Sequence, residues 1–262
     1  MERYSNPEGR MLTSKPVALI TGASSGLGAV FATKLAARGY DLILVARRTE
    51  KLKINNAEII SADLGTRQGT DAVVAAIERN PRLELLVNNA GFGTKGRFWE
   101  TDLAGQEQMH QLHIMAVMRL TRAALAGMVP RGSGAVINVS SVAAFGTSEG
   151  NVSYCATKAW MNNFTLGLDV ELRALGSPVK VQALCPGFTI TEFHDTMGVS
   201  RSPIPGFLWL KADDVVEASL SGLSRNNPIL VPTWKYKFVV ACMKLLPGSI
   251  TRSARPSLGK RV

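Results

Sequence analysis

Tyr154 and Lys158 stand four residues apart in the stretch VSYCATKAW, which otherwise has the pattern of a helix. Side chains at this spacing lie on the same face of a helix. A phenol has an ordinary pKa of about 10, too high for easy proton exchange at neutral pH, whereas a neighbouring ammonium lowers that pKa. Pairs at this spacing are also common on helix surfaces. The pair is therefore either an exposed contact or a proton donor with the cation that tunes it.

A serine at the end of a predicted strand gives this pair a context. Ser141 ends the apolar segment GAVINVSS, thirteen residues before Tyr154. At the carboxyl end of a parallel strand its hydroxyl lies where such sheets bind ligands. The three residue types then have complementary roles: Ser141 polarises a carbonyl group, Tyr154 gives it a proton, and Lys158 tunes Tyr154.

Short apolar runs alternate with helical patterns along the chain. The expected strands are 16–21, 41–46, 57–62, 83–89, 134–141 and 179–185, and the expected helices are 26–39, 67–79, about 105–128 and about 152–175. This order predicts an α/β fold in which helices cover both faces of a doubly wound parallel sheet. No linker interrupts the alternation. We expect one domain over residues 15–250, a loose arm at 1–14 and a basic tail at 251–262.

The glycine-rich stretch TGASSGLG stands between the first predicted strand and the first predicted helix. Gly22, Gly26 and Gly28 allow a tight turn whose N–H groups can approach a pyrophosphate, and the helix N-terminus adds its positive end. Ser24 and Ser25 can add hydroxyl donors. The alternative is an ordinary glycine-rich turn, but the strand-loop-helix setting favours a phosphate cradle.

The second predicted strand ends in VARR, where a dinucleotide site reads the ribose of the adenosine. Arg47 and Arg48 occupy this place instead of a carboxylate, which indicates a 2′-phosphate, with Arg47 as the first candidate. The alternative is two solvated surface arginines. Asp63, after the third strand, could accept a hydrogen bond from an adenine amino group. The stretch NNAG (88–91) ends the fourth strand and lies either at the ligand or in a simple turn.

The composition of the chain limits the kinds of molecule that it is expected to bind. The chain has 262 residues, 46% of them hydrophobic, and its 30 Lys and Arg against 20 Asp and Glu give a charge of +10. Such a charge suits a phosphate-bearing ligand, an anionic membrane surface or a nucleic acid. The basic residues occur singly and in pairs, and no zinc-finger or RNA-binding signature is present. We therefore expect no nucleic-acid partner.

The cysteines and histidines do not indicate a disulfide framework or a metal site. Cys155, Cys185 and Cys242 are odd in number and share no metal-ligand spacing, and the three histidines form no obvious set. A reducing, cytoplasmic compartment is expected. The N-terminus lacks an apolar signal core, and we expect no transmembrane helix because no window of 18 uncharged apolar residues occurs.

Four stretches of the sequence resemble the motifs of the short-chain dehydrogenase/reductase family in order and spacing. They are TGASSGLG, NNAG, Ser141 with YCATK, and PGFTIT (186–191). The resemblance covers about residues 15–225. It implies a Rossmann-type sheet of seven strands, a nicotinamide cofactor, and reversible chemistry between a carbonyl and an alcohol. The stretch VARRTEKL is similar to the branch of the family that prefers NADP(H).

The resemblance also implies roles for residues around the cofactor. Lys158 is expected to bond to the nicotinamide ribose, and the turn at Pro186–Gly187 to pass around the nicotinamide end. The expected cofactor-binding residues are Gly22, Ser24, Ser25, Gly26, Leu27, Gly28, Arg47, Arg48, Asp63, Leu64, Asn89, Ala90, Gly91, Tyr154, Lys158, Pro186, Gly187, Thr189 and Thr191. The expected catalytic residues are Ser141, Tyr154, Lys158 and His113.

His113 departs from the family pattern, which usually has an asparagine there. That asparagine holds a kinked helical turn and a water linked to the lysine. An imidazole is larger and ordinarily titrates near neutral pH. We expect His113 either to enter the proton relay and titrate near pH 6.5, or to be a packed helix residue. His110 is expected at the surface or an interface, and His194 near the substrate or in solvent.

Apolar residues indicate a hydrophobic substrate. Residues 192–210, expected to cover it, include Phe193, Met197, Phe207, Leu208 and Trp209, and Phe92, Phe145 and Phe188 lie beside the motifs. Part of this set could instead be core. Residues 233–246 have an amphipathic pattern and could close the pocket, pair with another subunit, or lie on an anionic membrane.

These patterns favour an NADPH-dependent reductase of a hydrophobic ketone, aldehyde or 3-oxoacyl-type substrate, working as a homodimer or homotetramer. Two alternatives stay open. One is an NAD-dependent secondary-alcohol or hydroxysteroid dehydrogenase. The other is a dinucleotide-binding regulator without turnover, for which only His113 argues.

Overall fold

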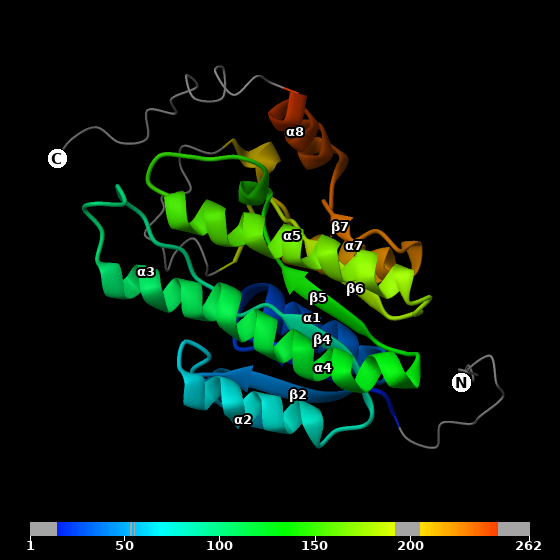
Figure 1. The fold of residues 1–262 in the computed structure, drawn as a ribbon. Helices are drawn as coiled ribbons and strands as arrows, with labels where there is room; N and C mark the ends of the chain where they lie inside the picture. Colours follow the sequence, from blue (N-terminus) through cyan, green and yellow to red (C-terminus); the bar gives the residue numbers. More distant parts are fainter. Residues whose placement is uncertain (1–14, 53, 55, 192–204, 246–262) are drawn as a thin grey trace.

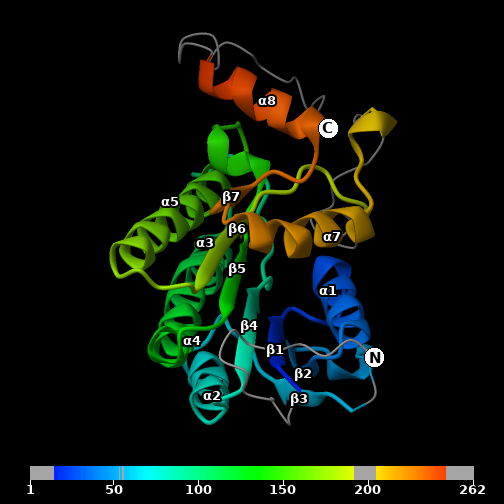
Figure 2. The ribbon, with the colours of Figure 1, turned by 90° about the vertical axis from the view of Figure 1, so that its right-hand side faces the viewer.

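Seven parallel strands form one sheet, in which they follow the order β3-β2-β1-β4-β5-β6-β7. Figure 1 shows the sheet between its helices, and Figure 2 labels every strand. The computed structural model describes residues 15–52, 54, 56–191 and 205–245. The strands are β1 (Val17–Thr21), β2 (Asp41–Ala46), β3 (Glu58–Ser61), β4 (Leu83–Asn88), β5 (Ala135–Val139), β6 (Lys180–Leu184) and β7 (Ile229–Leu230). The predicted doubly wound parallel sheet is confirmed. Its seventh strand was expected only from the family resemblance, since two residues carry no pattern.

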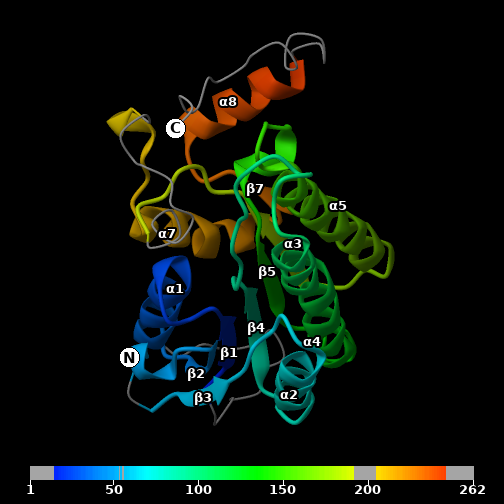
Figure 3. The same ribbon diagram turned by 90° about the vertical axis from the view of Figure 1, so that its left-hand side faces the viewer.

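Helices cover both faces of the sheet (Figures 2 and 3). The α-helices are α1 (Gly26–Ala37), α2 (Arg67–Glu78), α3 (Leu103–His110), α4 (Val117–Arg131), α5 (Val152–Ala174), α7 (Ala212–Gly222) and α8 (Trp234–Leu245). Short 3-10 helices are η1 (Thr49–Lys51), η3 (Val142–Phe145), η4 (Gly206–Leu208) and η5 (Leu223–Arg225). α1 and α7 lie on one face, and α2, α4 and α5 lie on the other.

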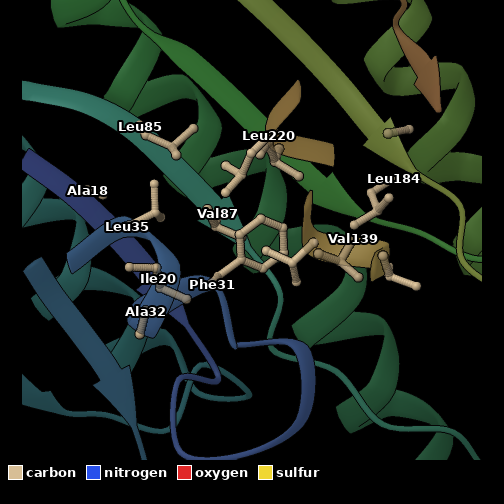
Figure 4. Close-up of a cluster of buried hydrophobic side chains, with 14 of the residues drawn as sticks. Ala18, Ile20, Phe31, Ala32, Leu35, Leu85, Val87, Val139, Leu184 and Leu220 are labelled. Carbon is tan, nitrogen blue, oxygen red and sulfur yellow. The ribbon is translucent and has the colours of Figure 1, made fainter. Parts of the chain in front are cut away.

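The core consists of two apolar layers, one on each face of the sheet. Under α1, Phe31 and Leu35 pack against Ile20 and Val87, and Leu220 joins them from α7 (Figure 4). The opposite layer contains Val73, Leu120, Met128 and Leu172 from α2, α4 and α5. Because both faces are covered, β1 is buried throughout and β4 is buried except at Glu84, as their largely apolar sequences predict.

The helix predicted at about 105–128 is longer and is interrupted. A π-helical turn, η2 (Gln111–Ala116), separates α3 from α4, and Asp102 caps the start of α3 by accepting hydrogen bonds from backbone N–H groups. By length and composition alone, Leu103–Arg131 is the one helix in the described part of the chain that could cross a membrane, which the sequence did not lead us to expect. In the fold its inner side packs on the sheet as a core helix does.

The order of the strands places the loops that carry the motifs at one edge. β2 and β3 extend to one side of β1, and β4 to β7 extend to the other. The carboxyl ends of β1 and β4 therefore flank the point where the winding reverses, and open parallel sheets bind ligands there. The arm at 1–14, the tail at 251–262 and residues 192–204 lie outside the described residues.

Candidate active site

Ser141 and Tyr154 meet at the carboxyl edge of the sheet. Ser141 lies two residues beyond β5 in extended conformation, and its Oγ accepts a hydrogen bond of 3.1 Å from the backbone N–H of Ala143 at the start of η3. Tyr154 projects from the first turn of α5 and its phenol is hydrogen-bonded to the side chain of Ser141. The structure thus brings together the first two residues of the predicted trio.

Lys158 lies one helical turn beyond Tyr154 and is buried. Its Nζ donates a hydrogen bond of 2.8 Å to the backbone carbonyl of Val139, the last residue of β5. The same Nζ lies 5.7 Å from the centroid of the Tyr154 ring. This hydrogen bond to β5 holds the Lys158 amine beside the Tyr154 phenol, so the structure brings all three residues of the predicted trio together.

Burial shifts the pKa values of this pair in directions that the sequence did not predict. Burial raises the pKa of Tyr154 to about 12, although its hydrogen bond to Ser141 opposes that shift. Burial lowers the pKa of Lys158 to about 7. We expected the ammonium to lower the tyrosine pKa. In the protein alone, removal from water is the largest cause of both shifts, because desolvation disfavours each charged form.

The glycine loop has the close contacts that a phosphate cradle requires. Gly22 and Gly26 have left-handed backbone angles, φ +65° and +55°. A Cβ on Gly28 would lie 2.2 Å from the Gly22 carbonyl oxygen, so a side chain there would displace the loop. The side chain of Asn89 donates hydrogen bonds to the carbonyls of Thr21 (2.9 Å) and Gly22 (3.2 Å) and holds the loop in place. These residues fit a dinucleotide pyrophosphate at the start of α1.

At the other end of the cleft, Arg47 and Asp63 face each other. Nη1 of Arg47 lies 3.9 Å from Oδ2 of Asp63, and Oδ1 of Asp63 accepts a hydrogen bond of 2.9 Å from the N–H of Gly65. Arg48 lines the same cleft. The predictions assigned Arg47 to a phosphate and Asp63 to adenine separately. The structure adds that the two charges are neighbours.

The chain turn at Pro186–Thr191 forms the wall near the catalytic trio. Thr189 and Thr191 line the cleft, and the hydroxyl of Thr189 donates to the carbonyl of Gly187 at 2.9 Å. A Cβ on Gly187 would lie 1.9 Å from the ring of Tyr236, so this glycine is required by α8 packing against it. The Tyr236 hydroxyl accepts from the N–H of Phe188 (3.0 Å) and donates to the carbonyl of Leu208 (2.9 Å).

His113 is buried in the π-helical turn, directly behind Gly91. Its Nδ1 lies 3.0 Å from the hydroxyl of Thr157, and that hydroxyl donates to the carbonyl of Tyr154 at 2.9 Å. A hydroxyl has one proton, so Thr157 accepts from Nδ1–H and Nε2 is left unprotonated. Nε2 is buried and has no hydrogen-bond partner among the described residues; a Cβ on Gly91 would lie 2.7 Å from it.

The environment of His113 overturns the expectation that it titrates near pH 6.5. Burial, the charge of Lys158 and the charge of His110 hold its pKa well below the ordinary value. The Tyr154 ring lies edge-on to the imidazole, with centroids 5.9 Å apart. His113 is therefore a neutral imidazole at neutral pH, and any transition that it causes is displaced toward acid.

Comparison with known proteins identifies the family of the chain. Residues 16–200 match the family described as short chain dehydrogenase. The chain belongs to the short-chain dehydrogenase/reductase family. An uncharacterized oxidoreductase of Bacillus subtilis, YmfI, is 36% identical over 186 residues, which cover 67% of this chain and 75% of that protein.

Solved short-chain dehydrogenases share the whole architecture. One from Sphingobium yanoikuyae in complex with NADPH has a TM-score of 0.78 and 30% identity, over 94% of this chain and 98% of that chain. The bulky-bulky ketone specific alcohol dehydrogenase of Comamonas testosteroni has a TM-score of 0.74 and 27% identity, over 95% and 98%. A Burkholderia phymatum member in complex with NAD has 0.75 and 25%, over 95% and 99%. This chain is therefore an NAD(P)-dependent oxidoreductase.

Most residues predicted for this family member's site line one cleft. They are Gly22, Ser24, Ser25, Gly26, Leu27, Arg47, Arg48, Asp63, Leu64, Asn89, Ala90, Gly91, Ser141, Tyr154, Lys158, Pro186, Thr189 and Thr191. Gly28, Gly187 and His113 lie behind its walls and shape it through close packing. Sequence reasoning missed Val45, Ala46, Ala62, Gly65, Gln108, Leu112, Val139 and Ser140. Several of these residues are next to predicted motifs in the sequence and could have been predicted from that position. No feature of the sequence indicates that Gln108 or Leu112 lines the cleft.

The other predicted candidates have mixed outcomes. Phe92 lines the cleft, whereas Phe207 is exposed and Phe188 packs against Trp209 with ring centroids 5.7 Å apart. Leu208 contributes a backbone carbonyl to Tyr236, and Phe145 lies beneath Lys244. Nδ1 of His110 contacts the carbonyl of Gln106 at 2.8 Å. Phe193, His194 and Met197 fall outside the described residues. The three cysteines are free, and no metal-binding cluster occurs among the described residues.

Proposed function

We propose that this oxidoreductase uses NADPH to reduce a hydrophobic ketone, aldehyde or 3-oxoacyl-type compound to the alcohol. The observation that carries the proposal is that Ser141, Tyr154 and Lys158 line one cleft, with Nζ of Lys158 5.7 Å from the centroid of the Tyr154 ring. With a pKa of about 12, the phenol is protonated at neutral pH and ready to donate to a carbonyl oxygen. Bound nicotinamide supplies the hydride.

Three other residues of the chain support this proton transfer or shape its site. The Ser141 hydroxyl can orient the carbonyl oxygen next to the phenol. Lys158, fixed on Val139, places an amine beside Tyr154, where a positive charge stabilises the phenolate that forms as the proton leaves. The neutral Nε2 of His113 stands behind Gly91 and supports the wall of the cleft.

Two basic side chains at the adenosine end support the preference for NADPH. Arg47 and Arg48 both line the cleft, and guanidinium groups bind phosphate with paired donors. One observation favours NAD instead: the carboxylate of Asp63 already faces Arg47 at 3.9 Å and would repel a 2′-phosphate. An NAD-dependent secondary-alcohol or hydroxysteroid dehydrogenase is therefore the second candidate.

A panel assay tests the proposal. Purified protein is mixed with NADPH or NADH and a series of ketones, aldehydes and acyl thioesters, and loss of nicotinamide absorbance is followed. Because a structural relative from Comamonas testosteroni is specific for bulky ketones, the series includes ketones with two large substituents. We expect turnover with NADPH on apolar carbonyls and slower turnover with NADH. Faster turnover with NADH on every compound, or turnover of polar compounds only, would overturn the proposal.

A further inference from the structure

Helix α8 has a buried face and an exposed apolar stripe. Tyr236 and Val240 are buried in the core, whereas Trp234, Phe238 and Leu245 are 74%, 67% and 82% exposed. At about 100° per residue, these three exposed residues fall within roughly 40° of one another around the helix. Figure 2 shows α8 at one end of the molecule, over β7 and α5. The exposed stripe therefore points outward.

The buried face fixes the orientation of the helix. The Tyr236 hydroxyl bridges the backbone of Phe188 and Leu208. Farther along, the methyl group of Met243 lies 2.3 Å from where a Cβ on Gly146 would be. Nζ of Lys244 lies 5.1 Å from the centroid of the Phe145 ring. With these contacts at both ends, the stripe cannot turn inward without breaking the packing of α8.

The surroundings of the stripe are basic. α8 contains Lys235, Lys237 and Lys244 and no acidic residue. The helix thus carries three cations and no anion beside the stripe. A helix with lysines around an exposed Trp-Phe-Leu stripe has the composition of helices that lie in a membrane interface.

We infer that the outer face of α8 docks on an anionic phospholipid surface. The cations complement lipid phosphates and serine headgroups, and the stripe gains by entering the acyl boundary. A second copy of this chain is a poorer occupant, because two α8 faces would bring only like charges together. A nucleic acid would use the cations but leave the aromatic stripe in water.

Docking of α8 on a membrane places the end of the cleft that contains Ser141 and Tyr154 near the lipid. α8 contacts η3, which begins directly after Ser141, and packs on the Pro186–Thr191 wall through Tyr236. This consequence rests on the proposed function, since an apolar ketone or aldehyde concentrates in a bilayer. The docking itself does not depend on which substrate is used.

Vesicle sedimentation of the full chain tests the inference. Vesicles of phosphatidylcholine alone are compared with vesicles that also contain phosphatidylserine, at low and high salt. We expect binding to the anionic vesicles that weakens in high salt. The variant Lys237→Gln should bind about fivefold more weakly, at about 1 kcal/mol per cation. Trp234→Ala/Phe238→Ala should also lose binding. Trp99→Ala, which removes an exposed tryptophan far from α8 in the sequence, is the matched control and should bind as wild type.

Further measurements separate the alternatives. Reduction of a water-soluble carbonyl by each α8 variant in the absence of vesicles should equal that of wild type, which shows that the variants are folded. No binding of wild type to anionic vesicles at low salt, or equal binding by all variants, would overturn the inference. A dimer in solution that the Trp234→Ala/Phe238→Ala variant loses would assign the face to a second copy. Tight binding of an oligonucleotide with no vesicle binding would assign it to nucleic acid.

Discussion

Nδ1 of His113 lies 3.0 Å from Oγ1 of Thr157, and this contact joins the π-helical turn to the helix that carries Tyr154. The same Thr157 hydroxyl donates to the backbone carbonyl of Tyr154. One hydroxyl therefore links the residue that departs from the family pattern to the residue expected to donate the proton. The link leaves Nε2 of His113 as a buried acceptor that faces Gly91.

The first prediction concerns the titration of His113. Its pKa is held well below 6.5, so folding favours the neutral imidazole. The stability that this contributes is present above the unfolded pKa and is lost as the pH falls through the lower folded pKa. We expect the melting temperature of wild type to fall more on acidification from pH 7 to about 5 than that of His113→Asn.

Rate profiles complete the test of His113. His113→Asn restores the usual family residue and is expected to remain active. With saturating cofactor, the pH–rate profiles of wild type and His113→Asn should agree near pH 6.5. Such a transition in wild type alone would mean that the imidazole titrates in its ordinary range. Identical acid sensitivity of the two melting temperatures would also contradict the prediction.

The second prediction concerns the proton donor. Tyr154→Phe keeps the ring beside Lys158 and removes the hydroxyl, so turnover should fall by a factor of about 10² to 10⁴, the usual span for a general acid. Cofactor affinity, measured by nicotinamide fluorescence, should change little. The matched control is Tyr236→Phe, which removes a hydroxyl that bonds only to backbone groups among the described residues and should keep most of the turnover. More than a tenth of the wild-type rate in Tyr154→Phe would remove Tyr154 from this role.

The third prediction concerns cofactor choice. A charge-assisted hydrogen bond contributes about 1.5–3 kcal/mol, so Arg47→Ala should weaken NADPH binding roughly ten- to a hundredfold and leave NADH binding nearly unchanged. Asp63→Asn removes the carboxylate that faces Arg47 and should shift the preference further toward NADPH. Titration of each variant with both cofactors measures these changes. Equal losses for NADPH and NADH in Arg47→Ala would exclude Arg47 as the phosphate ligand and leave Arg48→Ala as the next test.

The fourth prediction concerns the stability of the protein without cofactor. Burial lowers the pKa of Lys158 from 10.5 to about 7, so between these values the unfolded chain binds a proton that the folded chain lacks. Stability from this group therefore rises with pH in that window and is lost as the pH falls through about 7. The melting temperature of wild type should rise from pH 7 to about 9 relative to that of Lys158→Met. Parallel pH profiles for the two proteins would show that the amine is not held neutral.

Two other buried groups titrate at or above the upper end of this window. Burial raises the pKa of Tyr154 and the pKa of Cys185 to about 12 each. The Tyr154 shift reduces stability only where the unfolded phenol ionises, near pH 10, whereas the Cys185 shift does so from about pH 8.5, where the unfolded thiol ionises. Lys158→Met keeps both groups, so the difference between the two pH profiles reports on Lys158, most directly below about pH 8.

Local patterns in the sequence predicted the order of the strands and helices and most of the residues that line the cleft. Apolar runs that end in glycine or polar residues predicted six strands because buried parallel strands need such runs. The glycine loop, Arg47, NNAG and the Ser141–Tyr154–Lys158 trio were predicted because each depends on spacing along a strand end or a helix turn. Each of them contributes residues to the lining of one cleft in the structure.

Only the tertiary structure decided how these groups behave. The directions of the Tyr154, Lys158 and His113 pKa shifts follow from burial, which no spacing shows. The pairing of Arg47 with Asp63 and the packing of Tyr236 on Gly187 join residues that are 16 and 49 positions apart. A sequence pattern reports neighbours along one element. Desolvation and contacts between elements depend on how the whole sheet and its helices pack together.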